Sequence, residues 1–125
     1  YTQTLFGRRR HFPGITSGAP FIKAMAERMA INAPVQGTAA DLMRLAMIRV
    51  YQHLVDKQLS GRVRMLLQVH DELVFEIKDS ELSQIIPQLV ALMEGVMNGR
   101  ETHGVPLKVE VATGANWGEL VPWVG

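Results

Sequence analysis

The stretch LLQVHDELVFEI, residues 66–77, decides how the rest of the chain can fold. Strand-forming side chains fill both of its ends, and three polar residues, His70, Asp71 and Glu72, interrupt them. Two alternating runs joined by so few residues predict a tight antiparallel hairpin over residues 62–78. The period of two predicts that the first strand has one apolar face, made of Val63, Met65, Leu67 and Val69.

The polar interruption has two interpretations. Aspartate is common in turns for reasons of backbone geometry, so the HDE triplet can be an ordinary acidic turn. A hairpin apex also projects carboxylates beyond the sheet edge, where metal-dependent phosphoryl transfer needs rigidly placed oxygen ligands. Adjacent residues in a strand point in different directions, so Asp71 and Glu72 are not expected to bind one ion symmetrically. The local sequence leaves both interpretations open.

Upstream of this hairpin the pattern predicts a shorter hairpin and two helices. TLFG followed by RRRHF predicts two strands that pivot at Gly7. A helix is expected to begin at Pro20, because a first turn does not need the N–H that proline lacks. Pro34 disfavours helical geometry at the residue before it, so we expect a break or a sharp kink there and a second, amphipathic helix over residues 38–59.

Downstream, an apolar stripe predicts a helix that follows Asp79 and ends near Asn98, with Pro87 costing stability or bending it. The elements therefore run hairpin, two helices, hairpin, helix, strand, which predicts an α+β fold with helices packed on an antiparallel sheet. The last strand is expected in VPLKVEVAT, with an apolar face made of Leu107, Val109 and Val111.

The composition is globular and excludes some classes of protein. Of 125 residues, 47% are hydrophobic and 20% are charged, and the absence of cysteine excludes disulfides and thiolate metal sites. Apolar runs such as IIPQLVALM are too short to span a bilayer, so we expect no membrane partner. The net charge is +1, yet residues 1–30 carry five Lys and Arg against one Glu. This basic end could meet phosphates, although a run such as RRR is commonly a solvated surface.

A second polar group, Arg28, Asn32 and Gln36, has a spacing of four residues. On an unbroken helix these side chains would share one face, and their donors could reach acceptors in a nucleic-acid minor groove or on phosphates. The alternative is the plain solvent-facing side of an amphipathic helix.

Four segments resemble one known family. AERMAINAPVQGTAADLMRLAM and MLLQVHDELVFE closely resemble segments of the family A DNA polymerases, the bacterial DNA polymerase I type. TLFGRRRHFPG and GVPLKVEVATGANW are similar to its flanking segments in the same order, so the resemblance covers essentially the whole chain. It implies an incomplete palm whose antiparallel sheet combines the central hairpin with the C-terminal strand. Residues 1–37 would be a hairpin and the helix that links fingers and palm, and residues 38–125 the C-terminal palm subdomain.

The resemblance also implies roles for six residues. Asp71 matches the palm aspartate that helps hold two divalent ions, usually Mg²⁺, and Glu72 matches the adjacent acidic residue with a supporting catalytic role. His70 matches a residue placed near the terminal backbone of the primer. Contacts with the primer–template close to the nascent pair are implied for Arg28, Asn32 and Gln36.

The implied activity is that of a DNA-directed DNA polymerase, with primer–template DNA and deoxynucleoside triphosphates as partners, in the cytoplasm and associated with the nucleoid. The family's other metal-binding carboxylate would lie upstream of this chain. We therefore expect a section of a longer polymerase that is inactive without the upstream remainder. A non-catalytic nucleic-acid-binding or assembly module derived from a polymerase is the alternative. Metal-dependent phosphohydrolases also use an HD pair, but they place it on a helix, whereas here it interrupts strand alternation.

Overall fold

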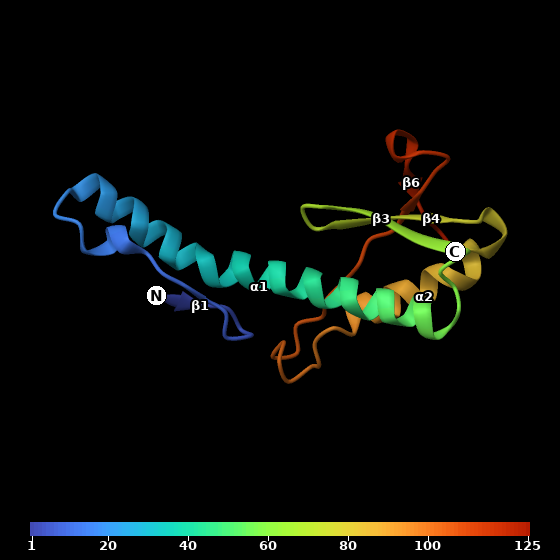
Figure 1. Cartoon of the computed structure of the whole chain (residues 1–125), viewed down its shortest axis with the longest axis horizontal. Helices are drawn as coiled ribbons and strands as arrows, with labels where there is room; N and C mark the ends of the chain where they lie inside the picture. The colour runs from blue at the N-terminus through green and yellow to red at the C-terminus, as the bar shows by residue number, and fades with distance from the viewer. The chain divides into compact units, whose positions relative to one another are not determined.

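Helix α1, Pro20–Asp56, is the longest element and runs through both parts of the chain (Figure 1). The computed structural model describes residues 1–125, which form an N-terminal unit, Tyr1–Arg44, and a C-terminal unit, Leu45–Gly125. Two α-helices and three two-stranded antiparallel sheets make up the regular structure. The predicted α+β class is confirmed. None of the helices is long and apolar enough to cross a membrane.

The N-terminal unit folds a short hairpin onto the first part of α1. Strands β1, Thr2–Gln3, and β2, Arg9–Arg10, pair antiparallel, and Gly7 adopts a φ of +85° in the predicted turn between them. A 3-10 helix, Pro13–Thr16, then leads to α1. Small helix side chains let the hairpin strand approach closely, and the buried cluster consists of Phe12, Ala30 and Ala33.

The expected break at Pro34 was wrong, because α1 continues through it. An interior proline removes one helical hydrogen bond and costs about 3 kcal/mol or more. The hairpin supplies other bonds one turn later. The Leu5 amide donates to Thr38 Oγ1 at 3.0 Å, and the Arg8 guanidinium donates to the Gly37 carbonyl at 3.1 Å. We infer that these tertiary contacts offset part of the cost and hold the helix together.

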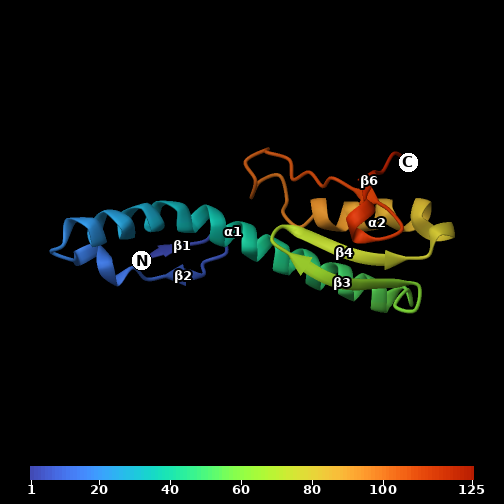
Figure 2. The ribbon, with the colours of Figure 1, turned by 90° about the horizontal axis from the view of Figure 1, so that it is seen from above.

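The predicted central hairpin is confirmed, as β3, Val63–Val69, and β4, Glu72–Ile77 (Figure 2). Its register contains a β-bulge, since Met65 pairs with Phe75 but Leu67 pairs with the very next partner residue, Val74. An extra residue in one strand moves every later side chain to the opposite face.

The bulge corrects the predicted apolar face of β3. Met65 and Phe75 pack against the core, whereas Leu67, 49% exposed, and Val69 now share a face with Val74. The expectation that Val69 and Leu67 lie on the face of Met65 was therefore wrong. Period-two alternation alone does not reveal an inserted residue.

The C-terminal unit has the larger core. A 3-10 turn, Asp79–Glu81, leads into α2, Leu82–Glu94, which ends one turn before the expected Asn98 and continues unbroken through Pro87. The apolar stripe of α2 packs with the end of α1 and the start of β3. Buried side chains of this core are Val50, Leu54, Leu59, Val63, Ile85 and Leu89.

The last expected strand does not form over its predicted length. Strand β5, Ala112–Thr113, pairs only with β6, Val121–Pro122, in a sheet separate from the central hairpin. The preceding segment keeps its alternating burial but has no partner strand. Its Val109 amide instead donates to a Glu94 carboxylate oxygen at 3.0 Å.

Candidate functional site

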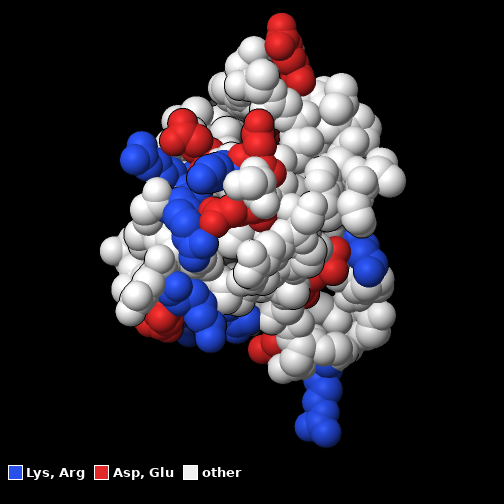
Figure 3. Space-filling model, turned by 90° about the vertical axis from the view of Figure 1, so that its right-hand side faces the viewer, with Lys and Arg blue, Asp and Glu red and all other residues white.

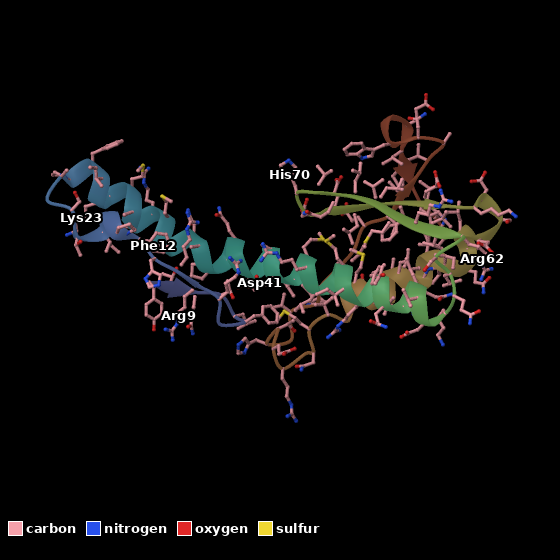
Figure 4. All side chains as sticks on the ribbon, in the orientation of Figure 1. Arg9, Phe12, Lys23, Asp41, Arg62 and His70 are labelled. Carbon is pink, nitrogen blue, oxygen red and sulfur yellow. The ribbon has the colours of Figure 1, made fainter.

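The turn between β3 and β4 carries the three polar residues His70, Asp71 and Glu72, which we call the hairpin tip. All three side chains are exposed, and Figure 4 shows His70 at the free end of the hairpin. His70 has a φ of 52°, a left-handed conformation that is uncommon outside glycine but that histidine adopts more readily than most residues. The tip is therefore a tight turn that presents its side chains to solvent.

Neighbouring residues hold this turn in place. Val69 pairs with Glu72 at the last rung, and Gln68 pairs with Leu73 on the rung before it. The Gln68 side-chain amide also donates to the carbonyl of His70 at 2.7 Å, which fastens the turn to its own strand. Val69 and Leu73, which flank the tip, are half-buried. Asp71 thus projects from a turn supported by backbone pairing and one side-chain bond.

The donor chemistry of the tip suits a hard divalent ion. Asp71 and Glu72 offer carboxylate oxygens, and Mg²⁺ is typically bound through one or two carboxylates together with substrate phosphates and water. The structure contains no group of three or more His, Cys, Asp or Glu side chains placed to hold a metal ion. The tip therefore offers carboxylate oxygens of the kind that Mg²⁺ takes, but its side chains do not by themselves form a complete metal site.

The second predicted group lies on α1. Because the helix is unbroken, Arg28, Asn32 and Gln36 follow one another in steps of four residues, each turned by about 40° from the last, and all three are exposed. Large apolar side chains are interleaved with them, and Ile31 and Val35 are each 75% exposed. A plain solvent-facing helix side would not carry so many exposed apolar groups, so this mixed face is suited to contact with another molecule.

Sequence reasoning missed one polar cluster, which we call the hairpin clamp and define as Thr4, Arg8, Gly37 and Asp41. Arg8 Nε donates to the buried carboxylate of Asp41 at 2.8 Å, and the Arg8 guanidinium also reaches the Gly37 carbonyl. The neighbouring Thr4 hydroxyl and then the Arg8 guanidinium lower the pKa of Asp41 below its usual value, in spite of burial. The sequence does contain one signal for this cluster, the aspartate Asp41 inside the apolar run TAADLM.

The clamp borders a cavity of about 210 Å³ between the hairpin and α1. Its lining includes Arg8, Arg10 and the polar-row residue Gln36, together with Thr2 and Ala33. The clamp thus fixes the hairpin beside the end of the polar row within the N-terminal unit.

The six predicted residues form two groups. The structure brings together His70, Asp71 and Glu72 at one turn of the C-terminal unit. In the N-terminal unit it aligns, along one side of α1, the residues Arg28, Asn32 and Gln36. Their roles in binding and catalysis stay predictions.

Several known proteins are similar to this chain in sequence. The profile of the family described as DNA polymerase family A matches residues 1–119. DNA polymerase I from Rhizobium leguminosarum is 47% identical over 119 residues, which cover 95% of this chain and 12% of that protein. The thermostable DNA polymerase I of Thermus thermophilus is 48% identical over 117 residues, which cover 94% of this chain and 13% of that protein.

A solved structure is also similar. It is the POL domain of Pol1 from M. smegmatis in a complex with DNA primer–template and dNTP, with a TM-score of 0.75 and 40% sequence identity. The match covers 86% of this chain and 18% of that one. The chain thus spans only about an eighth of the length of the curated relatives, 12% and 13% of the two described above.

Proposed function

Because the chain belongs to DNA polymerase family A, we propose that it forms the C-terminal part of a DNA-directed DNA polymerase domain and contributes to template-directed nucleotidyl transfer. The observation that carries the proposal is the family match over residues 1–119, within which the hairpin tip presents Asp71. A solved relative holds primer–template and dNTP, and we propose the same partners for this chain. The cytoplasm, in association with the nucleoid, is the corresponding proposed location.

The proposed chemistry centres on the hairpin tip. Asp71 would hold Mg²⁺, Glu72 would support the site as a second acidic group, and His70 would contact the primer near its end. The chemistry supplied by a pair of such ions, when bound, is stabilisation of the attacking and leaving oxygens. The support from Gln68 keeps Asp71 in a defined position, which matters because a metal-bound substrate must be oriented closely.

The mixed face of α1 has a different proposed task. Arg28, Asn32 and Gln36 would contact the primer–template near the nascent pair, where side-chain donors meet base-edge acceptors and phosphates. In this division, residues 1–37 link the fingers to the palm, and residues 38–125 form the C-terminal palm subdomain. The exposure of the three polar side chains along one side of α1 supports their proposed contact with DNA.

We further propose that the active site needs a partner segment. Two ions lying about 3.5–4 Å apart require more carboxylate ligands than the tip provides. Since the curated relatives are about eight times longer than the matched region, the second metal-binding carboxylate is proposed to come from the upstream remainder of the polymerase.

Primer extension tests this proposal. The purified chain is assayed alone and then together with a separately expressed upstream segment of the polymerase, in the presence of Mg²⁺. Extension is expected only in the combined reaction, and it should be lost when the combined reaction contains Asp71→Asn. Extension by the chain alone contradicts the need for a partner. Duplex binding without extension in either reaction instead supports a non-catalytic module.

A further inference from the structure

The N-terminal hairpin has two different faces. Its register pairs Gln3 with Arg9, and strand alternation then turns Thr4 and Phe12 towards α1, where both are buried. In Figure 4, Arg9 lies on the side of the hairpin that faces away from α1. The side chains of this second face are all exposed, and we call it the outer hairpin face, made of Tyr1, Gln3, Arg9 and His11.

The outer hairpin face is an ordered cluster of flat groups. The guanidinium carbon of Arg9 lies 4.5 Å from the centre of the Tyr1 ring. The rings of Tyr1 and His11 have centroids 5.7 Å apart and are tilted by 56°. A cation above an aromatic ring gains about 0.5–1 kcal/mol at an exposed site, which favours the Arg9–Tyr1 contact, and the tilted ring pair places His11 beside Tyr1. The result is a π-rich surface with a fixed positive charge.

The charge of this face has no local compensation. Residues 1–26 contain no acidic residue. Arg8 is bound by Asp41, whereas none of the ion pairs in the chain involves Arg9. The N-terminal unit has six Lys and Arg against two acidic residues, a balance of +4. The C-terminal unit has seven against ten, a balance of −3, and Figure 3 shows its charges intermixed.

These features select one class of ligand. Proteins that bind single-stranded nucleic acid combine cations along the backbone with aromatic rings on which bases stack. A duplex could use the same cations, but its bases are already stacked on one another. We infer that the outer hairpin face binds an unpaired strand of DNA, with a base stacked on the exposed Tyr1 ring and a phosphate at Arg9. The inference rests on the proposed function and names the part of the primer–template that this face takes.

Fluorescence anisotropy with the full 125-residue chain tests the inference. The probes are a labelled single strand of about 12 nucleotides, which is within the usual site size, and a blunt duplex of the same sequence. The variants are Tyr1→Leu, which keeps an apolar side chain without a ring, and Arg9→Gln. Arg100→Gln is the matched control, because it removes one exposed positive charge from the C-terminal unit.

Tyr1→Leu is expected to weaken single-strand binding on the order of tenfold, the loss of one stacked base, and to leave duplex binding unchanged. Arg9→Gln should lower the salt-dependence slope by about 0.7, the value for one phosphate contact on a single strand. Arg9→Lys keeps the charge and should restore the slope. Circular dichroism of each variant confirms that the chain is folded.

Two results overturn the inference: a loss of single-strand affinity in Arg100→Gln equal to that in Arg9→Gln, or a loss of duplex affinity in Tyr1→Leu equal to its loss of single-strand affinity. Neither depends on catalysis, so they are separable from the proposed function. If the combined primer-extension reaction succeeds while Tyr1→Leu binds single strands normally, only this inference fails. If single-strand binding depends on Tyr1 and Arg9 but no extension occurs, only the proposed function fails.

Discussion

The two units of the chain differ in how they use apolar residues. The N-terminal unit buries one large side chain, Phe12, against alanines, while α1 leaves Phe21, Ile31 and Val35 about three-quarters exposed. The C-terminal unit closes an aliphatic core with Val50 and Val63 almost completely buried. The N-terminal unit therefore leaves much of its apolar surface exposed, whereas the C-terminal unit buries its apolar side chains in a core.

Charge follows the same division. The N-terminal unit has a balance of +4 and carries the polar row of α1, whereas the C-terminal unit has a balance of −3 and carries the hairpin tip. Basic, partly apolar surfaces suit a polyanion that also offers flat bases, and acidic tips suit metal ions. We therefore expect substitutions in the two units to affect different steps of DNA synthesis.

The largest expected effect is on incorporation by the assembled enzyme. Asp71→Asn removes the charge of the proposed metal ligand without changing the side-chain shape, and metal assistance is worth several kcal/mol, so kcat should fall on the order of 10³-fold. Primer–template affinity should hardly change. Gln36→Ala should show the reverse pattern, with duplex binding weakened by about 1–3 kcal/mol. Single-turnover kinetics and anisotropy measure the two quantities separately.

The control for this pair is Asp79→Asn, an exposed carboxylate just after β4 that lies outside the tip. It should leave both incorporation and duplex affinity unchanged. Equal binding losses in Asp71→Asn and Gln36→Ala would contradict the division between the units.

The next effect concerns stability of the scaffold. Leu54 is 4% exposed in the core of the C-terminal unit, and Leu54→Ala should lower the free energy of unfolding by about 2–5 kcal/mol. Val35→Ala, at a side chain 75% exposed in the N-terminal unit, should change it by less than about 0.5 kcal/mol. Urea unfolding followed by circular dichroism compares the two variants, and similar losses would show that Val35 is covered in solution.

Local pattern was enough to predict the hairpins and the apolar stripe of α2. Alternation, turn residues around Gly7 and the HDE triplet, and three- and four-residue spacing each depend on near neighbours in the sequence. The class α+β followed from the order of these elements. The candidate residues of the hairpin tip could also be predicted from the sequence, because a short polar interruption between two alternating apolar runs indicates a turn.

Features that depend on distant contacts were not predictable in this way. Pro34 stays within α1 while residues about 30 positions away bond the next helical turn, at Thr38 and Gly37. The bulge between Met65 and Leu67 is a choice of register with no separate sequence signal. The segment around Val109 has the pattern of a strand, but pairing also needs a partner, and its amide bonds a helix carboxylate instead.

A smaller effect tests how the hairpin is attached to α1. A Cβ at Gly37 would lie 2.7 Å from Thr4 Cγ2, so Gly37→Ala forces the hairpin away and should cost about 1–3 kcal/mol in spite of the better helix propensity of alanine. Thr4→Ser removes that methyl group and keeps the hydroxyl that accepts from the Arg8 amide, so the double variant should recover most of the loss. Hydrogen exchange should place the change in the N-terminal unit alone.

Gly61→Ala is the matched control for this substitution, because nothing lies within 4 Å of its added Cβ, and it should be neutral or slightly stabilising. Failure of Thr4→Ser to rescue Gly37→Ala would show that the close contact with Thr4 is not what requires a glycine.

The smallest expected effect is the pH dependence of the hairpin clamp. The pKa of Asp41 is lowered below its ordinary value of 3.8 by the Thr4 hydroxyl and the Arg8 guanidinium, so the folded state favours the carboxylate. The contribution of Asp41 to the stability of the folded state is therefore present at pH values above 3.8 and is lost as the pH falls through that value towards the folded pKa.

Near neutral pH, Asp41→Asn should lower the free energy of unfolding by about 1 kcal/mol, because the Arg8 side chain is 47% exposed and the ion pair is partly screened by solvent. Urea unfolding from pH 7 down to about pH 3 should show the difference from wild type shrinking with acidity, and the exposed Glu110→Gln serves as control. A difference that stays constant over this range would mean that packing around Asp41, rather than its charge, fastens the hairpin to α1.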